Sequence, residues 1–433
     1  MLEVPRFPLV STAPVPERAV LVGIEGRHGA WPVDRSLDEL ERLADTAGAQ
    51  TVARISQRLE RPNPRTFIGS GKVDELCGLV KRIDADVVIF DDDLTPSQQS
   101  NLERAVGEPV KIIDRTALIL DIFGLHATTR EGRLQVQLAQ LQYLLPRLRG
   151  MWSHLAKEQT RGGIGSRFGQ GESQLEVDRR LIRNRISTLR RELAQLERRR
   201  DVQAKSRKAS AAFRVALAGY TNAGKSSLLN RLTGSDVLAQ DRLFATLDPT
   251  TRAYRLPGGR EMTITDTVGF IQKLPHGLVE AFKSTLAEAR DADLIVKVVD
   301  CADEDALRHI DAVDRVLDEI GAGETPALVV FNKADLLDDE GRGALSLRHP
   351  GAVLCSAVTG LGIEELIERL AHEAAAQDRL IDVELPYREG ALAKLVHEQG
   401  HIMVEEYNET GVHLVAKVSP RIAGLLGRYA TAP

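Results

Sequence analysis

The sequence predicts an α/β protein of several domains, and three observations lead to this prediction. The chain has 433 residues, which is too long for one ordinary core and corresponds to roughly three domains. Short β-branched runs alternate with helical stretches in two separate regions, as they do where helices connect parallel strands. Between these regions, residues 131–208 carry leucines and isoleucines at a 4-3 spacing, which is typical of paired long helices.

A Pro-rich lead at residues 1–18 precedes the first α/β domain, which we expect at residues 19–130. Its β-branched runs alternate with amphipathic stretches and therefore predict a parallel sheet with helical crossovers. The predicted strands are residues 19–24, 51–56, 86–90 and 110–114, and the predicted helices are residues 36–48, 71–83 and 96–106.

Residues 131–208 predict two helices in a long antiparallel hairpin, because each helix carries a narrow apolar seam that needs a partner. We expect Pro146 to bend or end the first helix. Residues 150–173 are rich in Gly, so we expect them to form a flexible, basic and exposed tip loop. The seam residues are Leu134, Leu138, Leu141, Leu145 and Leu148 in the first helix and Ile182, Ile186, Leu189, Leu193 and Leu196 in the second.

Residues 211–376 return to alternating strands and helices and predict a doubly wound α/β domain. A small α+β domain is expected at residues 380–433, with two or three strands and one or two helices. The predicted strands of the doubly wound domain are residues 214–220, 262–266, 293–300, 327–333 and 352–356, and those of the small domain are residues 381–386, 401–407 and 411–418.

Charge is distributed unevenly along the chain. The net charge is −5, yet residues 145–210 hold 17 Lys or Arg against 7 Asp or Glu, a balance of +10 that leaves −15 for the remainder. A basic stripe on an otherwise acidic protein indicates a polyanionic partner, and a solvated helix face is the alternative interpretation.

The cysteines and the hydropathy bear on where the protein works. Cys77, Cys301 and Cys355 are scattered and lack C-x-x-C spacing, so they support neither a disulfide framework nor a zinc site. The N-terminus lacks the apolar core of a signal peptide, and no apolar stretch approaches the roughly 20 residues that span a bilayer. We expect a cytoplasmic monomer without membrane insertion.

Residues 219–227, GYTNAGKSS, match the motif G-x-x-x-x-G-K-[ST] between a predicted strand and a predicted helix. Glycines in this loop allow successive N–H groups to converge on phosphate oxygens, with a chance Gly-rich turn as the alternative. Lys225 would reach the β and γ phosphates, and the Ser226 hydroxyl would bind Mg²⁺. The expected phosphate-binding residues are Gly219, Tyr220, Thr221, Asn222, Ala223, Gly224, Lys225 and Ser226.

The segment TDTVGF at residues 265–270 supplies a second part of the site. Asp266 ends a predicted strand 41 residues after Lys225, where it can hold Mg²⁺ through water, and the Gly269 N–H can contact the γ phosphate. The expected nucleotide-binding residues here are Asp266, Thr267, Val268 and Gly269.

The segment FNKAD at residues 331–335 supplies a third part and indicates the base. A carboxylate that accepts from both N1–H and the exocyclic amine of guanine rejects adenine, so Asp335 implies GTP. A strand-exit turn with an Asx cap is the alternative for this segment alone, but three motifs in order after strands favour a P-loop GTPase domain. The expected base-binding residues are Asn332, Lys333, Ala334, Asp335, Ser356, Ala357 and Val358.

Between the phosphate loop and TDTVGF, the segment FATLDPTTR at residues 244–252 lies where a switch loop provides a Mg²⁺-binding Thr. Spacing does not choose among Thr246, Thr250, Thr251 and the more distant Thr221. The expected nucleotide-binding residues of this loop are Phe244, Ala245, Thr246, Leu247 and Asp248.

These motifs, and longer segments around them, resemble the HflX-type GTPases, a ribosome-associated branch of the translation-factor-related GTPases. The resemblance covers nearly the whole chain, and the sequence departs from the family pattern at residues 167–173, where RFGQGES replaces a loop close to RGPGET. Matching FATLD to the family's switch makes Thr246 the metal ligand, together with Ser226. The resemblance is carried by TFIGSGKVDE, FDDDLTPSQQSNLE, the stretch from Asp114 to Leu148, ESQLEVDRR, GYTNAGKSSL, LFATLDPTTR, TDTVGF and NKAD.

The resemblance implies GTP-dependent binding to the large ribosomal subunit, with the first domain and the hairpin against ribosomal RNA near the peptidyl transferase centre. It further implies splitting or rescue of stalled ribosomes under stress. Two alternatives are a GTPase that acts in RNA modification or subunit assembly, and an RNA-binding protein with a vestigial nucleotide site. The basic segment is consistent with RNA independently of the resemblance.

The catalytic group is not evident from the sequence. Ras-like GTPases orient the attacking water with a Gln after D-x-x-G, whereas Phe270 occupies that position and offers no hydrogen bond. Intrinsic hydrolysis should therefore be slow, with help from the bound ribosome or from K⁺ beside Asn222. Simple packing of Phe270 and a turn preference of Asn222 are the alternatives.

Other polar features have structural interpretations. GSGK at residues 69–72 resembles a shortened phosphate loop, but we interpret it as the Gly-rich start of a helix. The acidic run at residues 91–93 is expected to act as a helix cap rather than as a metal site. His126 and His154 have no partners that indicate metal binding or nucleophilic catalysis.

Overall fold

A computed structural model describes residues 16–26, 31–159, 168–208, 212–235, 243–244, 246–257, 259–273, 278 and 283–431 of the chain. The chain divides into two compact units. The first comprises residues 1–122 and 143–179, and the second comprises residues 123–142 and 180–433.

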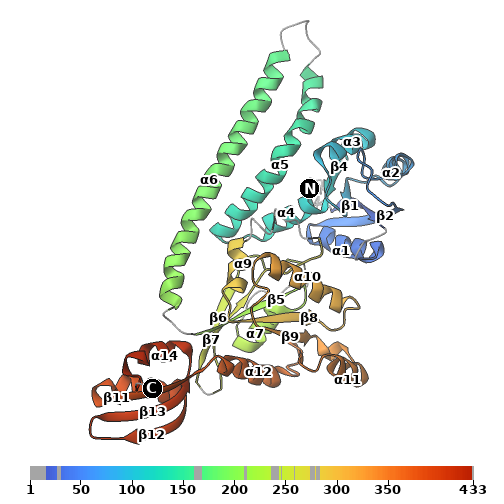
Figure 1. The fold of residues 1–433 in the computed structure, drawn as a ribbon. Coiled ribbons are helices and arrows are strands. Elements are labelled where there is room, and N and C mark those ends of the chain that lie inside the picture. Colours follow the sequence, from blue (N-terminus) through green and yellow to red (C-terminus); the bar gives the residue numbers. More distant parts are fainter. Residues whose placement is uncertain are drawn as a thin grey trace, which may run out of the picture. The chain divides into compact units, whose positions relative to one another are not determined.

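The first unit contains a four-stranded parallel sheet with the order β2-β1-β3-β4 (Figure 1). All four strands were predicted from the β-branched runs. Because the strands are parallel, the buried ends of β3 and β4 lie at the same edge, where Phe90 pairs with Asp114. The elements are β1 (Glu17–Glu25), α1 (Val33–Thr46), β2 (Ala49–Arg58), α2 (Ser70–Ile83), β3 (Val87–Phe90), α3 (Pro96–Val106), β4 (Lys111–Asp114) and α4 (Arg115–His126).

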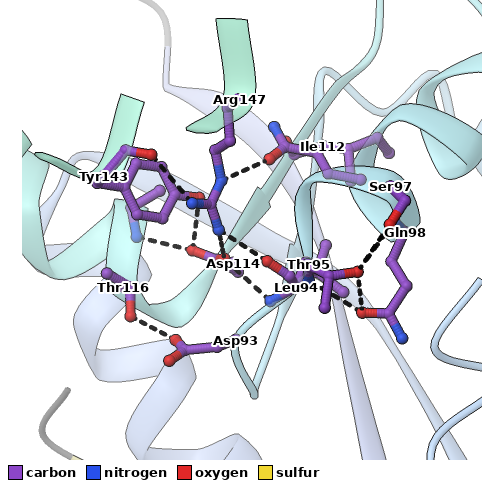
Figure 2. A network of polar contacts seen from close by, with 12 residues as sticks. Asp93, Leu94, Thr95, Ser97, Gln98, Ile112, Asp114, Thr116, Tyr143 and Arg147 are labelled. Atoms are coloured by element: carbon purple, nitrogen blue, oxygen red, sulfur yellow. Dashed lines mark hydrogen bonds and ion pairs between the residues drawn. The ribbon is translucent and has the colours of Figure 1, made fainter. Parts of the chain in front are cut away.

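A buried polar network holds part of the long helix α5 (Arg130–Gln159) against this edge of the sheet (Figure 2). The Asp114 carboxylate accepts hydrogen bonds from the Tyr143 hydroxyl at 2.8 Å and from the Arg147 guanidinium at 3.1 Å. It also accepts from the backbone N–H groups of Leu94 and Ala117 at 3.0 and 2.9 Å. Burial raises the pKa of Asp114, and these donors oppose the rise. The network fixes Tyr143 and Arg147 relative to the sheet.

Residues 69–72 begin a helix as predicted, whereas the expected helix cap at residues 91–93 is wrong, because Thr95 is the N-cap of α3. Helix α2 begins at Ser70, with Gly69 as its N-cap. Asp91 accepts from Ser36 at 2.5 Å and from the buried Arg115 at 2.7 Å, so its carboxylate is engaged within the protein. Over the described ranges, no cluster of three or more His, Cys, Asp or Glu residues could hold a metal ion.

The predicted helical hairpin is confirmed, with two corrections. Helix α5 continues through Pro146, so the expected end of the helix at that residue is wrong, and a bend there stays a prediction. Helix α6 (Phe168–Lys208) begins inside the predicted connector, so the helices are longer than expected. Residues 160–167 of the flexible tip expected at residues 150–173 lie outside the described residues. The buried seam residues include Leu134, Leu138, Leu148, Ile186, Leu189 and Leu193.

The two helices run in opposite directions within the second unit (Figure 1). Arg130 near the start of α5 lies 3.9 Å from Glu192 of α6, and Gln137 accepts a hydrogen bond from Arg185 at 2.9 Å. Along these contacts the residue numbers rise in α5 while they fall in α6, as in an antiparallel pair. None of the helices that the structure describes is long and apolar enough to span a bilayer.

The second unit contains a six-stranded sheet with the order β10-β9-β8-β5-β7-β6. Chain order reverses on the two sides of the central strand β5, and loops at such a point form the usual ligand site of doubly wound sheets. The elements are β5 (Phe213–Gly219), α7 (Lys225–Thr233), β6 (Thr250–Arg255), β7 (Glu261–Asp266), α9 (Lys283–Arg290), β8 (Leu294–Asp300), α10 (Ala306–Glu319), β9 (Ala327–Asn332), α11 (Asp339–Arg348), β10 (Val353–Leu354) and α12 (Ile363–Ala376).

Strand β6 was not predicted. It is antiparallel to β7 and forms one edge of the sheet, whereas the remaining pairs are parallel. Thr250 and Thr251, which were expected in a switch loop, begin this strand and pair with Asp266 and Thr265.

The C-terminal part of the second unit is a three-stranded antiparallel sheet with the order β11-β13-β12 (Figure 1). Its apolar core includes Val383, Leu414, Val396 and Ile422, which come from two strands and two helices. The α+β character and all three predicted strands are confirmed. The elements are β11 (Arg379–Pro386), α13 (Gly390–Gln399), β12 (His401–Tyr407), β13 (Gly411–Val418) and α14 (Pro420–Leu426).

Candidate nucleotide site

The phosphate loop connects the central strand β5 to helix α7 and needs glycine at two positions. Gly224 has a φ of +88°, and a Cβ there would lie 2.3 Å from Nδ2 of Asn332. A Cβ on Gly219 would lie 2.3 Å from the Val298 carbonyl oxygen. Asn222 also has a left-handed φ of 61°, which Asn tolerates better than most residues and which agrees with a turn preference.

The Lys225 ammonium is buried under this loop. Its Nζ donates to the carbonyl oxygens of Gly219 at 3.2 Å and Tyr220 at 2.9 Å. Burial lowers the pKa of Lys225 to about 8, and the negative charge of Asp266 opposes the shift. Two carbonyl groups and one carboxylate are modest compensation for a buried cation, so this environment favours an additional anion.

Three oxygen-bearing side chains meet beside Lys225. The Ser226 hydroxyl donates to Oδ2 of Asp266 at 2.6 Å, and Oγ of Ser226 lies 2.9 Å from Oγ1 of Thr246. Burial raises the pKa of Asp266, and Lys225 and the two hydroxyls oppose the shift. Among the four threonines considered from the sequence, Thr246 is therefore the one whose hydroxyl lies next to Ser226.

The residues of this cluster fit Mg²⁺. Neighbouring ligands of an octahedral Mg²⁺, with bonds of about 2.1 Å, lie about 3 Å apart, which agrees with the separation of the two hydroxyl oxygens. Oδ1 of Asp266 is buried and has no hydrogen-bond partner among the described residues. A metal-bound water would donate to this oxygen, as expected for a carboxylate that holds the metal through water.

The TDTVGF segment lies directly against the phosphate loop. The Thr221 N–H donates to the Phe270 carbonyl at 2.7 Å, and the Phe270 N–H donates to the Gly219 carbonyl at 3.1 Å. A Cβ on Gly269 would lie 2.7 Å from Cγ2 of Thr221 and 3.2 Å from Nζ of Lys225, so only glycine fits there. The Phe270 side chain is fully buried, which agrees with a packing role and removes it from any attacking water.

The NKAD segment joins the two ends of the site. Nδ2 of Asn332 donates to the Ala223 carbonyl at 2.9 Å, and its Oδ1 accepts from the Ala357 N–H at 3.0 Å. Nζ of Lys333 lies 2.7 Å from Oδ2 of Asp300. Asp335 is exposed and accepts no hydrogen bond from another described residue, so its carboxylate is available to a base.

Several residues that were expected to bind the nucleotide have other contacts or offer no polar side chain. Thr267 donates its hydroxyl to the Leu217 carbonyl at 2.7 Å, and Ser356 Oγ accepts from the Thr359 N–H at 3.1 Å. Val358 is 79% exposed. Ala245 lies outside the described residues, and the buried residues that contribute packing or backbone are Val268, Leu247, Ala334 and Phe244.

The structure also brings in residues that sequence reasoning missed. Gln272 donates its backbone N–H to the Tyr220 hydroxyl at 2.6 Å, and the Tyr220 ring stacks on His309 of α10 at 3.8 Å between centroids. Asp248, which was expected to bind nucleotide, instead accepts hydrogen bonds from Thr128 and Thr129 through its carboxylate. No motif or spacing links these positions, so tertiary structure alone reveals them.

Three family models match the chain in succession. They are described as GTP-binding GTPase N-terminal at residues 34–124, GTP-binding GTPase Middle Region at residues 126–207 and 50S ribosome-binding GTPase at residues 214–333. GTPase HflX of Caldanaerobacter subterraneus subsp. tengcongensis is 46% identical over 414 residues, which cover 95% of this chain and 94% of that protein. GTPase HflX of Escherichia coli is 44% identical and is matched over 91% of this chain and 92% of its own length.

The chain belongs to the HflX family of GTPases. It has a P-loop GTPase domain and hydrolyses GTP to GDP and phosphate. Among solved structures, a GTP-binding protein from Sulfolobus solfataricus in complex with GDP is 23% identical, with a TM-score of 0.43, and covers 82% of this chain and 98% of its own. The family models and the two GTPase HflX relatives confirm the resemblance of the motifs to HflX-type GTPases over nearly the whole length.

Proposed function

We propose that this HflX GTPase binds the large ribosomal subunit in its GTP state, in the cytoplasm, and splits or rescues stalled ribosomes under stress. The observation that carries the proposal is the match of residues 214–333 to a family model described as a 50S ribosome-binding GTPase. Two relatives named GTPase HflX support it, since each is matched to this chain over more than nine tenths of its own length.

The charge of helix α6 supports an RNA partner. Residues 145–210 carry a balance of +10 on a chain whose net charge is −5. Arginines neutralise phosphates and release counterions, which provides affinity for RNA without sequence selection. The exposed arginines of α6 include Arg180, Arg183, Arg185, Arg190, Arg191, Arg198 and Arg199.

At the nucleotide site, we assign Ser226 and Thr246 as ligands of Mg²⁺ and Asp266 as its partner through water. Bound Mg²⁺ would neutralise charge on the β and γ phosphates during hydrolysis. Lys225 would place a buried positive charge beside the same phosphates, and Gly269, whose N–H is expected to contact the γ phosphate, lies close to Lys225. Asp335 would select guanine by accepting from its two donors, while Asn332 holds the surrounding loops.

Water attacks the γ phosphate directly, and the described chain provides no polar side chain at position 270 to orient that water. Slow intrinsic hydrolysis is the expected result, with the bound ribosome or K⁺ beside Asn222 as the source of stimulation. Rates measured in K⁺ and Na⁺ at equal ionic strength test the second source, and equal rates would remove it.

Sedimentation of assembled ribosomes through sucrose gradients tests the proposal. With the protein and a non-hydrolysable GTP analogue, we expect separation into subunits, with the protein on the large one. The same mixture with GDP is the nucleotide control, and Ser226→Ala is the site control. Co-migration with intact ribosomes would overturn splitting, and preference for free RNA or precursor particles would favour a role in RNA modification or subunit assembly.

A further inference from the structure

We infer that Asp248 is a positioning residue for GTP hydrolysis, because it fastens the segment that carries Thr246 to the start of helix α5. The inference rests on the proposed metal site, in which Thr246 is a ligand. The hydrogen bonds of the Asp248 carboxylate come from Thr128 and Thr129 and not from Ser226 or Thr246. Asp248 would act through Thr246, two residues earlier in the chain.

The contact is made by several donors that converge on one carboxylate. Oδ2 of Asp248 accepts from the backbone N–H groups of Thr128 and Thr129 at 3.1 and 2.8 Å, and from the Thr128 hydroxyl at 2.7 Å. Oδ1 accepts from the Thr129 hydroxyl. A Cβ on Gly132 would lie 2.5 Å from Oδ1, so the first turn of α5 leaves room for this carboxylate only because glycine is present.

The electrostatic environment favours the ionised form of Asp248. The N-terminal end of a helix presents unpaired N–H groups and a partial positive charge, and α5 begins at Arg130. Burial by itself raises the pKa of Asp248, but the hydrogen bonds from Thr129 and Thr128 outweigh it and lower the pKa. Donors therefore hold both oxygens of the carboxylate.

The rest of the segment is held on both sides of Thr246. The Phe244 ring packs edge-on against Phe123 of α4, with 4.7 Å between centroids and an interplanar angle of 84°. Leu247 is buried. With Phe244 and Asp248 both attached to residues 123–129, the Thr246 hydroxyl between them has little freedom to leave Ser226.

Residues outside the GTPase motifs thus hold the Thr246 hydroxyl in the position that metal binding requires. Metal binding then does not have to order the segment that carries Thr246, and the free-energy cost of that ordering is avoided. The same linkage works in reverse, since a metal that holds Thr246 also holds Asp248 at the start of α5. Residues of the middle region thereby take part in the GTPase site.

The test compares the Mg²⁺ dependence of GTP hydrolysis in the full chain. Asp248→Ala should raise the Mg²⁺ concentration for half-maximal rate on the order of tenfold, as expected for loss of a cap-like charged contact. GDP affinity measured without Mg²⁺ should stay within about twofold of wild type, because the phosphate loop and Asp335 are intact. A merely structural role would weaken GDP binding as well.

Two further variants identify the contact. Thr128→Val combined with Thr129→Val removes the two hydroxyl donors and should raise the half-maximal Mg²⁺ concentration by about threefold. When the two Val substitutions are added to Asp248→Ala, the half-maximal Mg²⁺ concentration should not rise further, because the Asp248 carboxylate that accepts from both hydroxyls is already missing. Additive effects would overturn the inference. Asp248→Asn keeps one acceptor and should restore part of the Mg²⁺ response, which also covers the case in which Asp248→Ala does not fold.

Controls separate this inference from the metal site on which it rests. Ser226→Ala must shift the Mg²⁺ dependence if the proposed site is right, and an unchanged response would overturn the site itself. A normal response of Asp248→Ala and Asp248→Asn, with a shifted response of Ser226→Ala, would overturn the role of Asp248 alone. Asp311→Ala removes an exposed carboxylate on α10 and is expected to match wild type.

Discussion

At the scale of single residues, the site combines buried groups that need partners with one exposed group that is free to recognise a base. Lys225 and Asp266 are buried beside each other. Burial lowers the pKa of Lys225 and raises the pKa of Asp266, which favours the neutral form of each. Asp335 is exposed at the other end of the site. Substitutions at these positions should therefore affect binding in different and measurable ways.

Replacing Asp335 with Asn should change the preferred base. The Asn side chain loses one of two acceptors for guanine, so GDP affinity should fall on the order of 100-fold. Its amide can donate to the C2 carbonyl that xanthine carries in place of the guanine amine, so xanthosine diphosphate should bind the variant more tightly than it binds wild type. Competition against a fluorescent GDP measures both. Asp339→Asn, at a neighbouring carboxylate that is 99% exposed, is the control, and the same change in that variant would contradict the role of Asp335.

Nucleotide affinity should depend on pH through Lys225. Phosphates favour the ammonium form, so the pKa of Lys225 is higher in the complex than its value of about 8 in the free protein. The contribution of the Lys225 ammonium to nucleotide affinity is then complete below about pH 8 and is lost as the pH rises above it. GDP affinity should fall about fourfold between about pH 7 and about pH 8.5. Lys225→Met should bind weakly with a flat profile, and a flat profile in wild type would refute the assignment.

At the scale of helices and strands, the sequence was informative where local pattern determines structure. Short β-branched runs predicted the parallel strands of both α/β sheets, and the motifs placed the phosphate loop and NKAD at strand ends. Strand β6 was missed because four of its six residues, TTRAYR, are Thr or Arg and none of the six is buried. The passage of α5 through Pro146 and the contact of Asp248 with Thr128 depend on residues distant in sequence, which no local pattern reports.

The attachment of α5 to the first sheet should depend on Arg147. Its guanidinium lies 3.1 Å from Asp114, which is fully buried, and 3.5 Å above the Tyr143 ring. Arg147→Ala leaves a buried carboxylate without its cation and should lower the free energy of unfolding of this unit by about 3 kcal/mol. Urea unfolding followed by circular dichroism measures the change. Arg183→Ala, at an exposed site on α6, should stay within about 0.5 kcal/mol of wild type; an equal loss in both variants would argue against the network.

At the scale of the whole molecule, positive charge is concentrated in one segment while the remainder is acidic. Acidic surface repels RNA, so a basic segment on such a protein restricts RNA contact to one region of the chain. For an HflX GTPase, this distribution would direct association with ribosomal RNA through the hairpin.

Neutralising exposed arginines of α6 should therefore weaken binding to the large subunit in a salt-dependent way. Replacing Arg180, Arg183 and Arg190 with Gln should reduce the slope of log affinity against log salt by about two to three. Titration of labelled protein with subunits at several salt concentrations measures the slope. The matched triple at Arg315, Arg348 and Arg379, exposed positions outside the basic segment, should keep the wild-type slope. Equal slopes for the two triples would exclude α6 as the contact.

The amide of Asn332 has a consequence for ligands shorter than GDP. One planar group joins the loop that precedes α7 to the loop that follows β10, through Ala223 and Ala357. The span between the purine pocket and the phosphate cradle is therefore set before any nucleotide arrives, and it cannot contract around a smaller molecule. Guanosine alone would leave the cradle open and pyrophosphate alone would leave the pocket open, so the protein measures the length of its ligand as well as its base.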